Sequence, residues 1–390
     1  MTLAGSKAPT EGLLPLTDVQ REIVRTAREF AANELAPHVD ERDRKGEFSR
    51  EAVDALGRLG FLGMLIPEEW GGSGLDTVTY LLALEEIARV DPSLAVSMSV
   101  HNSLPTQLIL AHGSDDLKER YLRPMAEGRM LGAFALSESH AGSDPAALSC
   151  SAERRGDVWI LNGAKAWVTN GGTADLVLAM ARSGGPGPKG ISAFVIEPTW
   201  EGYAVGKEEK KMGLRSSNTA EIVFRDLEVP AANLLGEEGK GLAYALGALE
   251  HGRLGIAAQA LGIAGACLHL AVDWARERHA FGKPIAEFQG LRFLIVEMAA
   301  QIEAARALTH AAAAKKDRGE HARKEVAMAK LLASRAAMDA AVKAIQVYGG
   351  YGYMKDYPVE RYFRDAKVTE IYEGTSEIQR VVIASELLDG

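Results

Sequence analysis

The sequence predicts an α+β protein with three successive regions: helical, β-rich and helical again. Three observations indicate this order. Apolar residues recur at helical spacing up to about residue 128, short apolar or alternating runs occupy the middle of the chain, and long alanine-rich segments follow. We expect an N-terminal helical domain over residues 1–130, a middle β domain over residues 131–237 and a C-terminal domain of long bundle helices over residues 238–390.

The N-terminal region opens with a helix start signal. Thr17 is followed three residues later by Gln20, which is the spacing of a capping box. Pro37 marks the end of this helix, and Ser114 is the expected cap of a later helix over residues 115–126. Residues 1–7 have neither the apolar core of a signal peptide nor the arginines of a transit peptide, so we interpret them as a short disordered lead.

In the middle region, turn-forming residues separate short runs that favour strands. Residues 158–161 and 164–168 flank Asn162-Gly163, a dipeptide typical of two-residue hairpin turns, so we predict a hairpin there. Further strands are expected at residues 176–180, 192–196 and 219–224.

After the glycines at positions 236, 239 and 241, the pattern returns to alanine-rich helices, which are interrupted near residues 282–284 and 349–350. The longest apolar run, residues 255–272, is long enough to span a membrane. It contains Gln259, His269 and several glycines among many alanines. We therefore expect a buried helix rather than a membrane span.

Composition restricts the function. With 44 Lys and Arg against 53 Asp and Glu, the net charge is −9, which argues against nucleic acid as the main partner. Cys150 and Cys267 lie far apart, so neither a disulfide framework nor a metal site is indicated, and a reducing cytoplasm is the expected location. The sequence lacks the glycine motifs of nicotinamide and nucleotide enzymes and the His-Glu-x-x-His motif of zinc proteases.

Five separated segments carry the functional signal. In residues 371–380, Glu373 stands between Tyr372 and the Gly374-Thr375 pair, which places its carboxylate on a tight loop that a substrate can approach. A desolvated carboxylate there can act as a base, whereas a solvated glutamate at a turn is the ordinary alternative. The other segments are residues 134–144 (FALSESHAGSD), 167–172 (WVTNGG), 278–285 (RHAFGKPI) and 346–352 (QVYGGYG).

In this order and with these separations, the five segments resemble the acyl-CoA dehydrogenase family of flavoproteins, from about Leu16 to the end of the chain. The resemblance implies a three-domain fold with a C-terminal four-helix bundle, and FAD as cofactor. It implies oxidation of an acyl-CoA substrate to the trans-2-enoyl-CoA, as in fatty acid β-oxidation. It also implies a homotetramer arranged as a dimer of dimers, and an electron-transfer flavoprotein as redox partner.

The implied reaction needs a base and a hydride acceptor on neighbouring carbons. Glu373 would abstract the α proton, and the flavin would accept the β hydride because no amino-acid side chain can do so. The main-chain N–H of Glu373 and a ribityl hydroxyl of the FAD would stabilise the developing enolate oxygen. Some family members carry the base immediately before the arginine that corresponds to Arg253. This chain has Gly252 there, which favours Glu373 and a short-chain, butyryl-type member.

The resemblance implies several groups of FAD contacts. Those expected along the isoalloxazine ring are Phe134, Leu136, Ser137, Trp167 and Thr169, and those beside the cofactor on the catalytic segment are Thr375 and Glu377. The expected contacts to the pyrophosphate and adenosine portion are Arg278, Phe281 and Gln289. The contacts expected from a neighbouring subunit are Gln346, Gly349 and Gly350. Two local alternatives stay open: Trp167 as a core residue of a strand, and Gly349-Gly350 as a helix C-cap.

The resemblance also implies substrate contacts: Ser143 at the CoA portion, and Glu250, Arg253, Tyr372 and Gly374 around the acyl thioester. The alternatives are ordinary helix residues for Glu250 and Arg253 and a common Ser-Asp turn for Ser143.

One segment departs from the family pattern. The family usually has Thr-Glu-Pro where this chain has Ser137-Glu138-Ser139, so the geometry of the following loop is open. His140 in that loop is either an exposed residue or a phosphate contact.

Other functions compete with a short-chain dehydrogenase. An acyl-CoA oxidase or a nitroalkane-oxidising relative would pass electrons to oxygen, and the latter would carry aspartate in place of Glu373. A branched-chain acyl-CoA dehydrogenase differs in the shape of its pocket, which the sequence does not determine. A helical acyl-CoA-binding scaffold would need neither Trp167 nor Glu373.

Overall fold

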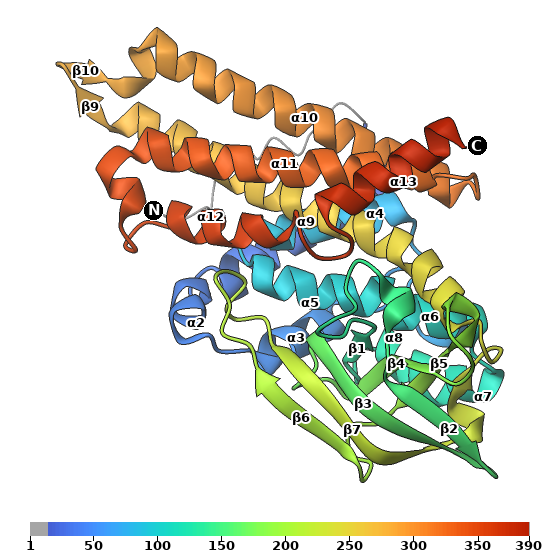
Figure 1. Cartoon of the computed structure of the whole chain (residues 1–390). Helices are drawn as coiled ribbons and strands as arrows, with labels where there is room; N and C mark the ends of the chain where they lie inside the picture. Colours follow the sequence, from blue (N-terminus) through green and yellow to red (C-terminus); the bar gives the residue numbers. More distant parts are fainter. Residues whose placement is uncertain (1–14, 390) are drawn as a thin grey trace.

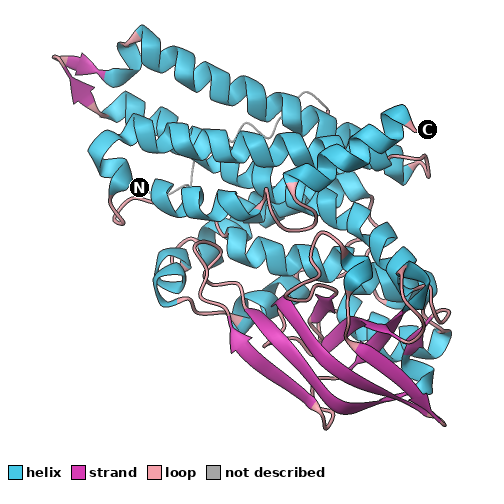
Figure 2. Cartoon of the chain, in the orientation of Figure 1, coloured by secondary structure: helices cyan, strands magenta, loops and turns pink. Residues whose placement is uncertain are grey.

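A computed structural model describes residues 15–389, and its helices and strands follow one another in the predicted order. Figure 1 shows a β-rich body with helices packed over it and a layer of long helices beyond them. In Figure 2 the strands of the main sheet gather in one body, and a separate two-stranded ribbon extends from the far end of the long helices. The predicted lead at residues 1–7 lies outside the described residues.

The N-terminal region is helical, as predicted. The first helix begins at the predicted capping box, in which the Thr17 hydroxyl accepts from the Gln20 N–H (3.2 Å) and the Gln20 side chain accepts from the Thr17 N–H (3.0 Å). Ser114 likewise caps the helical stretch that follows it. The elements are α1 (Asp18–Phe30), η1 (Ala31–Leu35), α2 (Val39–Lys45), α3 (Arg50–Arg58), η2 (Glu68–Trp70), α4 (Thr77–Ala88), α5 (Pro92–Ser103), α6 (Pro105–His112), α7 (Asp115–Leu117), η3 (Lys118–Leu122) and α8 (Arg123–Ala126).

The middle region forms an eight-stranded sheet in the order β6-β7-β3-β2-β4-β5-β8, with β1 paired to β4. The strands β1 and β4 are parallel, whereas β3 is antiparallel to both β2 and β7. The elements are β1 (Gly132–Ala135), η4 (Pro145–Ala147), β2 (Ser151–Arg155), β3 (Val158–Thr169), β4 (Leu176–Arg182), η5 (Pro188–Gly190), β5 (Ile191–Ile196), β6 (Tyr203–Glu208), β7 (Thr219–Pro230), η6 (Ala231–Asn233) and β8 (Leu234–Leu235).

The predicted hairpin at Asn162-Gly163 is wrong. Both residues lie inside the single strand β3, at a point where its register against β7 shifts, and the hairpin turn is instead Gly156-Asp157, between β2 and β3. Gly163 has a φ of +140°, and a Cβ on it would lie 2.8 Å from the Cα of Cys150. The glycine therefore permits a bulge and a close backbone approach rather than a turn.

The C-terminal region consists of long helices, as predicted. The helices α9, α10 and α11 pack on one another, and α12 and α13 both pack on α11, so the fourth position of the bundle is divided between two shorter helices (Figure 1). The elements are α9 (Gly241–Glu277), β9 (His279–Ala280), β10 (Lys283–Pro284), η7 (Ile285–Glu287), α10 (Gln289–Asp317), α11 (Arg323–Tyr348), η8 (Gly349–Tyr353), α12 (Val359–Val368) and α13 (Ser376–Leu388).

The apolar run at residues 255–272 lies within α9. By length and composition alone this is the one described helix that could cross a membrane, but 83% of its most apolar window is buried inside the protein. The helix packs against α11, α4 and α5. The run is therefore the buried helix that the sequence predicts.

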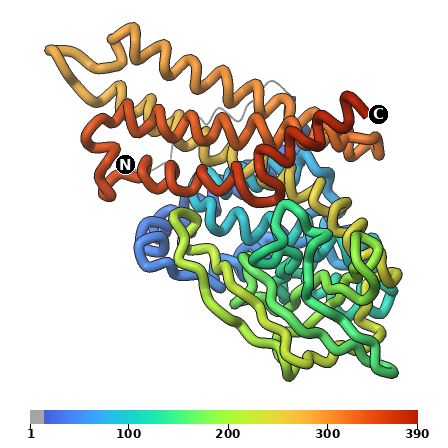
Figure 3. The backbone as a smooth tube through the Cα atoms, viewed as in Figure 1, coloured from blue at the N-terminus to red at the C-terminus, as the bar shows by residue number. Residues whose placement is uncertain are grey.

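One hydrophobic cluster joins the three regions. It contains Val96 and Val100 of α5, Leu136 after β1 and Ile256 of α9, and Tyr372, from the loop between α12 and α13, packs against it. In Figure 3 this loop turns toward the sheet-containing part of the chain. The segment around Glu373 is thus held at the meeting point of the helical and β regions.

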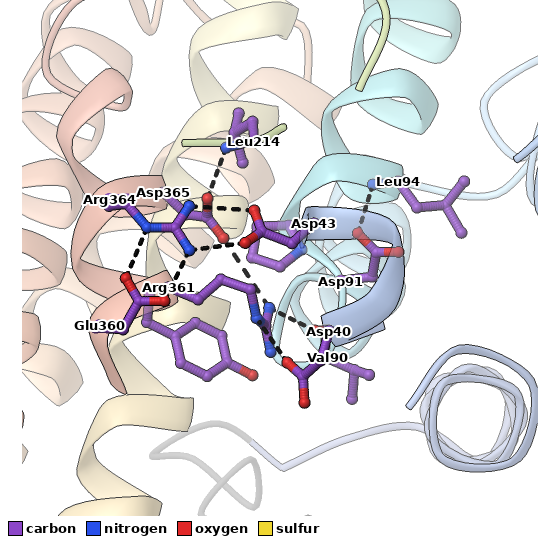
Figure 4. Close-up of polar contacts among 12 residues, drawn as sticks. Asp40, Asp43, Val90, Asp91, Leu94, Leu214, Glu360, Arg361, Arg364 and Asp365 are labelled. Carbon is purple, nitrogen blue, oxygen red and sulfur yellow. Dashed lines mark hydrogen bonds and ion pairs between the residues drawn. The ribbon is translucent and has the colours of Figure 1, made fainter. Parts of the chain in front are cut away.

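An ionic network fixes the approach to that loop. Figure 4 shows Arg364 of α12 held between Asp43 of α2 and Glu360, with its guanidinium bonded to Asp43 at 2.7 and 3.1 Å. The neighbouring Asp365 carboxylate accepts from the main-chain N–H of Leu214 at 2.6 Å. Because these contacts tie α12 to both earlier regions, the position of the following loop is determined by the whole fold.

Candidate active site

Glu373 lies in the short break between α12 and α13, in a backbone conformation that L-residues rarely adopt. Its φ is +53°, and that of the following Gly374 is +93°. A positive φ in a residue other than glycine costs roughly 1–2 kcal/mol and persists only where surrounding contacts enforce it. The break therefore carries the kind of local strain that gathers at functional sites.

Several bonds hold this loop in place. The carbonyl of Gly374 accepts from the Lys330 ammonium at 2.8 Å and from the Gln379 side-chain amide at 2.9 Å. Thr375 caps α13 by accepting from the Ile378 N–H at 3.3 Å. In the described residues the main-chain N–H of Glu373 donates no hydrogen bond, so it is free to serve a ligand.

The Glu373 carboxylate itself is isolated. The residue as a whole is only half-buried, but both side-chain oxygens are sealed from solvent and have no hydrogen-bond partner among residues 15–389. Burial raises its pKa from 4.5 to about 7, against the opposing effects of the Lys330 and Arg253 charges. Such a carboxylate can take up a proton near neutral pH.

Gly252 of α9 faces this carboxylate. A Cβ at position 252 would lie 1.7 Å from Oε2 of Glu373 and 2.6 Å from its Cδ. Only glycine leaves room for the side chain in this position. The absence of a carboxylate at position 252, noted in the sequence, is therefore matched by a structural need for glycine there.

Arg253 lies next to the same loop. Its side chain is buried, its Nε has no partner among the described residues, and a Cβ on Gly374 would lie 3.9 Å from that nitrogen. Burial lowers the pKa of its guanidinium. Glu250 instead lies 3.7 Å from the Lys316 ammonium, and the Tyr372 hydroxyl donates to the Gln259 side chain.

On the β side, Leu136 belongs to the hydrophobic cluster against which Tyr372 packs, and Phe134 packs against the same cluster. The carbonyl of Ser137 accepts from the Ala166 N–H at 2.9 Å, which joins this segment to the end of β3. The structure thus joins the two segments that are predicted to contact the flavin, and Tyr372, next to Glu373, packs against the cluster that contains Leu136.

Trp167 is not a core residue. Its side chain is 54% exposed, its φ is +56°, and it lies where the register of β3 shifts between Lys165 and Val168. Thr169 ends the strand just beyond it. The exposed indole excludes the core alternative and leaves the ring accessible to a ligand.

The loop that contains Ser143 is organised without the family's proline. The buried Glu138 carboxylate accepts from the Ser149 N–H (2.7 Å), the Cys150 N–H (2.9 Å) and the Lys165 ammonium (2.7 Å). Ser143 is exposed on this loop. The His140 side chain is 54% exposed, with its Nε2 3.7 Å from Glu138, so it is an exposed loop residue.

A second group of predicted cofactor contacts lies at the opposite end of α9. Phe281 is 95% exposed at the tip of the β9-β10 hairpin, and the Arg278 guanidinium lies 5.4 Å from the ring centre of Tyr351, which follows Gly350. The stretch of α9 from Gly252 to Glu277 spans about 38 Å. The sequence interpretation assigned only residues 346–350 to a neighbouring subunit, but the structure places both segments together, far from Glu373.

The remaining predicted residues lie at helix ends. Gly349 follows α11 with a φ of +61°, which fits the C-cap alternative, yet a Cβ on either Gly349 or Gly350 would meet nothing within 4 Å. Local crowding therefore does not explain the glycine pair. Gln289 begins α10 and Glu377 is exposed in the first turn of α13.

Sequence reasoning missed Lys330. This lysine has no exposed surface although it lies on α11 among apolar positions, and burial lowers its pKa to about 8. A lysine in register with Val326, Ala333 and Ala337 on the buried face of a helix is the signal that could have revealed it. Among the described residues no group of three or more His, Cys, Asp or Glu side chains is arranged to hold a metal ion.

Comparison with known proteins gives the family. Sequence models described as the N-terminal, middle and C-terminal domains of acyl-CoA dehydrogenase match residues 17–129, 133–227 and 239–388. An acyl-CoA dehydrogenase from Bacillus subtilis (strain 168) is 48% identical over 376 residues, which cover 96% of this chain and 99% of that protein.

Solved structures agree with this match. Butyryl-CoA dehydrogenase from Megasphaera elsdenii has a TM-score of 0.95 and 44% identity, covering 96% of this chain and 99% of that chain. A chain from a structure described as the electron transferring flavoprotein of Acidaminococcus fermentans has a TM-score of 0.96 and 46% identity, covering 97% and 100%. This protein belongs to the acyl-CoA dehydrogenase family.

Proposed function

We propose that this protein is a short-chain acyl-CoA dehydrogenase in which Glu373 removes the α proton of the substrate. The single observation that carries the proposal is the Glu373 carboxylate, which is buried, unpartnered within the described residues and held next to Gly252. The named relatives, one of which acts on butyryl-CoA, support the same reaction and a short substrate.

The base is suited to its task because its surroundings are dry. With a pKa of about 7, Glu373 is ionised in a large fraction of molecules at neutral pH and still basic enough to accept a proton from carbon. The free main-chain N–H of Glu373 is the residue's own donor for the thioester oxygen, where negative charge develops as the proton leaves. Tyr372, Gly374 and Arg253 would surround the acyl thioester, with Glu250 behind Arg253.

FAD is the cofactor of this family, and when bound it accepts the hydride from the β carbon. The exposed, strained Trp167 fits a planar ring, because nothing else in the described chain accounts for an indole turned out of a strand. Phe134, Leu136, Ser137 and Thr169 would form the rest of that surface, with Thr375 and Glu377 on the side of the catalytic loop. Ser143, on its exposed loop, would contact the CoA portion.

The cofactor site is proposed to use two subunits. An extended FAD molecule is shorter than the stretch of α9 that separates Glu373 from Arg278. Arg278, Phe281 and Gln289, together with Gln346, Gly349 and Gly350, would therefore serve the FAD of a neighbouring chain. This arrangement supports the expected homotetramer, built from dimers that exchange these contacts.

An electron-transfer flavoprotein is the proposed electron acceptor. The likeness to a chain from the structure described as an electron transferring flavoprotein supports this assignment. We propose the cytoplasm as the location, and the two cysteines, which are both free thiols, fit a reducing compartment.

The decisive experiment uses the holoenzyme with Glu373→Gln. The variant is expected to retain FAD and to bind acyl-CoA, but to lose anaerobic flavin bleaching by several orders of magnitude, because an amide cannot take up the proton. Bleaching at the parent's rate would reject the proposal. A titration of the parent with acyl-CoA substrates of graded length and branching defines the substrate, and rapid oxygen consumption with butyryl-CoA would indicate an oxidase instead.

A further inference from the structure

Lys330 is a charged side chain that neither the proposed base chemistry nor the cofactor contacts use. It lies on α11, whereas Gly252 lies on α9, and it has no exposed surface. Among the described residues its ammonium bonds only to the carbonyl of Gly374, at 2.8 Å. A buried lysine with a single neutral partner is energetically costly, so its position beside this loop calls for a reason.

The charges around the loop are unbalanced. Glu373 faces two buried cations, Lys330 from α11 and Arg253 from α9, and forms no ion pair within 4 Å with either in the described chain. The other titratable groups that act on these three residues are Tyr80 from α4, Glu250 from α9, Arg323 from α11, Tyr372 and Glu370 from the loop, and Glu377 from α13.

The two cations oppose the effect of burial on Glu373. Removal from water favours the neutral carboxylic acid, whereas a nearby positive charge favours the carboxylate, and in a dry site this attraction acts over several ångströms. Of these two cations, Lys330 has the larger lowering effect on the pKa of Glu373. Its own pKa of about 8 leaves it cationic at neutral pH.

We propose that Lys330 is the positioning residue of the base: its ammonium anchors the Gly374 carbonyl and supplies the buried positive charge that keeps the Glu373 carboxylate ionised. This inference rests on the proposed function of Glu373. Two side chains hold the Gly374 carbonyl, because the neutral amide of Gln379 also donates to it, at 2.9 Å. Lys330 provides an anchor and a charge, whereas Gln379 provides an anchor alone.

The two residues allow the charge to be separated from the anchor. The measurement is the rate of anaerobic flavin bleaching by butyryl-CoA, followed by stopped flow with holoenzyme from about pH 6 to about pH 10. Lys330→Met and Lys330→Gln are expected to shift the midpoint of this profile upward by about one pH unit or more. The rate at neutral pH then falls by about fivefold or more, and it recovers toward the parent's plateau at high pH.

Two variants serve as controls. Gln379→Met is expected to lower the plateau without moving the midpoint, because it removes a neutral donor from the loop. Lys343→Met removes another lysine of α11, about 20 Å along the helix from Lys330. The Lys343 ammonium pairs with Asp339 at 2.7 Å and with Glu297 at 3.3 Å. The pH profile of this variant is expected to have the parent's midpoint and the parent's plateau rate.

The inference is overturned if both Lys330 variants keep the parent's midpoint and lose only plateau rate, since that result assigns Lys330 an anchoring role alone. Failure of both variants to fold also counts against it, because a role based on charge tolerates a neutral side chain of similar length. Measuring Glu373→Gln in the same series distinguishes failure of the proposed function from failure of this inference. If it bleaches normally the proposed function fails, and if it is inactive while the Lys330 midpoint is unmoved only this inference fails.

Discussion

The position of the Glu373 carboxylate depends on the residue that faces it, Gly252, as well as on Glu373 itself. The chain contains 53 acidic residues, and most of them lie in solvent or pair with a base. This carboxylate is set apart by Gly252, whose missing side chain leaves the space that its oxygens occupy. At the residue scale, the proposed activity is therefore a property of a pair of positions on different helices.

The importance of Gly252 can be tested against a second glycine of the same helix. Gly252→Ala is expected to displace the Glu373 carboxylate and to lower the rate of flavin bleaching by at least about tenfold, the effect of roughly 1.4 kcal/mol. Gly247→Ala is the matched control, because a Cβ there meets nothing within 4 Å. Both changes improve helix propensity by about 1 kcal/mol, so equal bleaching rates in the two variants would contradict the proposed contact.

Burial of the ionised Glu373 carboxylate without a partner also lowers the stability of the folded protein. Its pKa is raised from 4.5 to about 7 in the folded protein, so the folded state binds more protons than the unfolded chain between these values. The free energy of unfolding therefore falls as pH rises through this window, by on the order of 3 kcal/mol.

Glu373→Gln removes this titration. We expect the FAD-loaded variant to require more denaturant for unfolding than the parent at about pH 8, and the advantage to disappear near about pH 4.5. Denaturant midpoints across this pH range measure the difference. A parent that is more stable than the variant at the higher pH would show that the carboxylate is stabilised rather than strained in the folded state.

At the scale of elements, two interruptions of regular structure build the site. The break between α12 and α13 presents Glu373, and the bulge near the end of β3 turns Trp167 outward. A second irregularity in β3, at Gly163, lets the strand pass over Cys150. There the side chain of Asn162 bonds to Asp226 at 2.9 Å across to β7, so a dipeptide that usually closes a hairpin instead continues a strand.

Substitution at Gly163 tests this account of the bulge. Gly163→Ala places a Cβ 2.8 Å from the Cα of Cys150 at a φ of +140°, and is expected to destabilise the fold by about 1–3 kcal/mol. Gly185→Ala, where a Cβ meets nothing within 4 Å, is the control in a loop of the same region. Thermal unfolding monitored by circular dichroism compares them, and equal midpoints would show that Gly163 is not required by crowding.

At the scale of the whole molecule, the residues predicted to contact FAD lie in two separate groups. Trp167 belongs to the group near Glu373, and Arg278 and Phe281 belong to the group at the far end of α9. Because we propose that two chains complete each FAD site, assembly and activity are expected to be linked.

Mixed assemblies test this arrangement. Glu373→Gln lacks the base, and Arg278→Ala is expected to lose FAD more readily than the parent while binding substrate nearly as well. In a hybrid dimer of the two variants, one site would contain both changes and the other neither, so about half of the parent's activity per dimer is expected to return. Hybrids that are no more active than the average of the two homomeric variants would indicate that each FAD is served by one chain.

The sequence alone determined the order of the regions and the family, and it pointed to Glu373 as the candidate base. Helical periodicity, the capping box at Thr17 and the five spaced segments are local patterns, and these led to the three-region fold, to the family and to Glu373 as candidate base. The domain boundaries and the roles of individual site residues stay predictions. Local patterns predict structure correctly where the interacting residues lie close together in sequence, as they do at a helix cap.

The tertiary structure decided what depends on residues that are distant in sequence. Only the packing of α9 against the loop shows that Gly252 faces Glu373, and only the path of α11 brings Lys330 to the Gly374 carbonyl. The hairpin at Asn162-Gly163 was predicted wrongly for the same reason, since contact with Cys150 overrides the local turn preference. Burial and electrostatic field are sums over many neighbours from several elements, and no single stretch of sequence contains them.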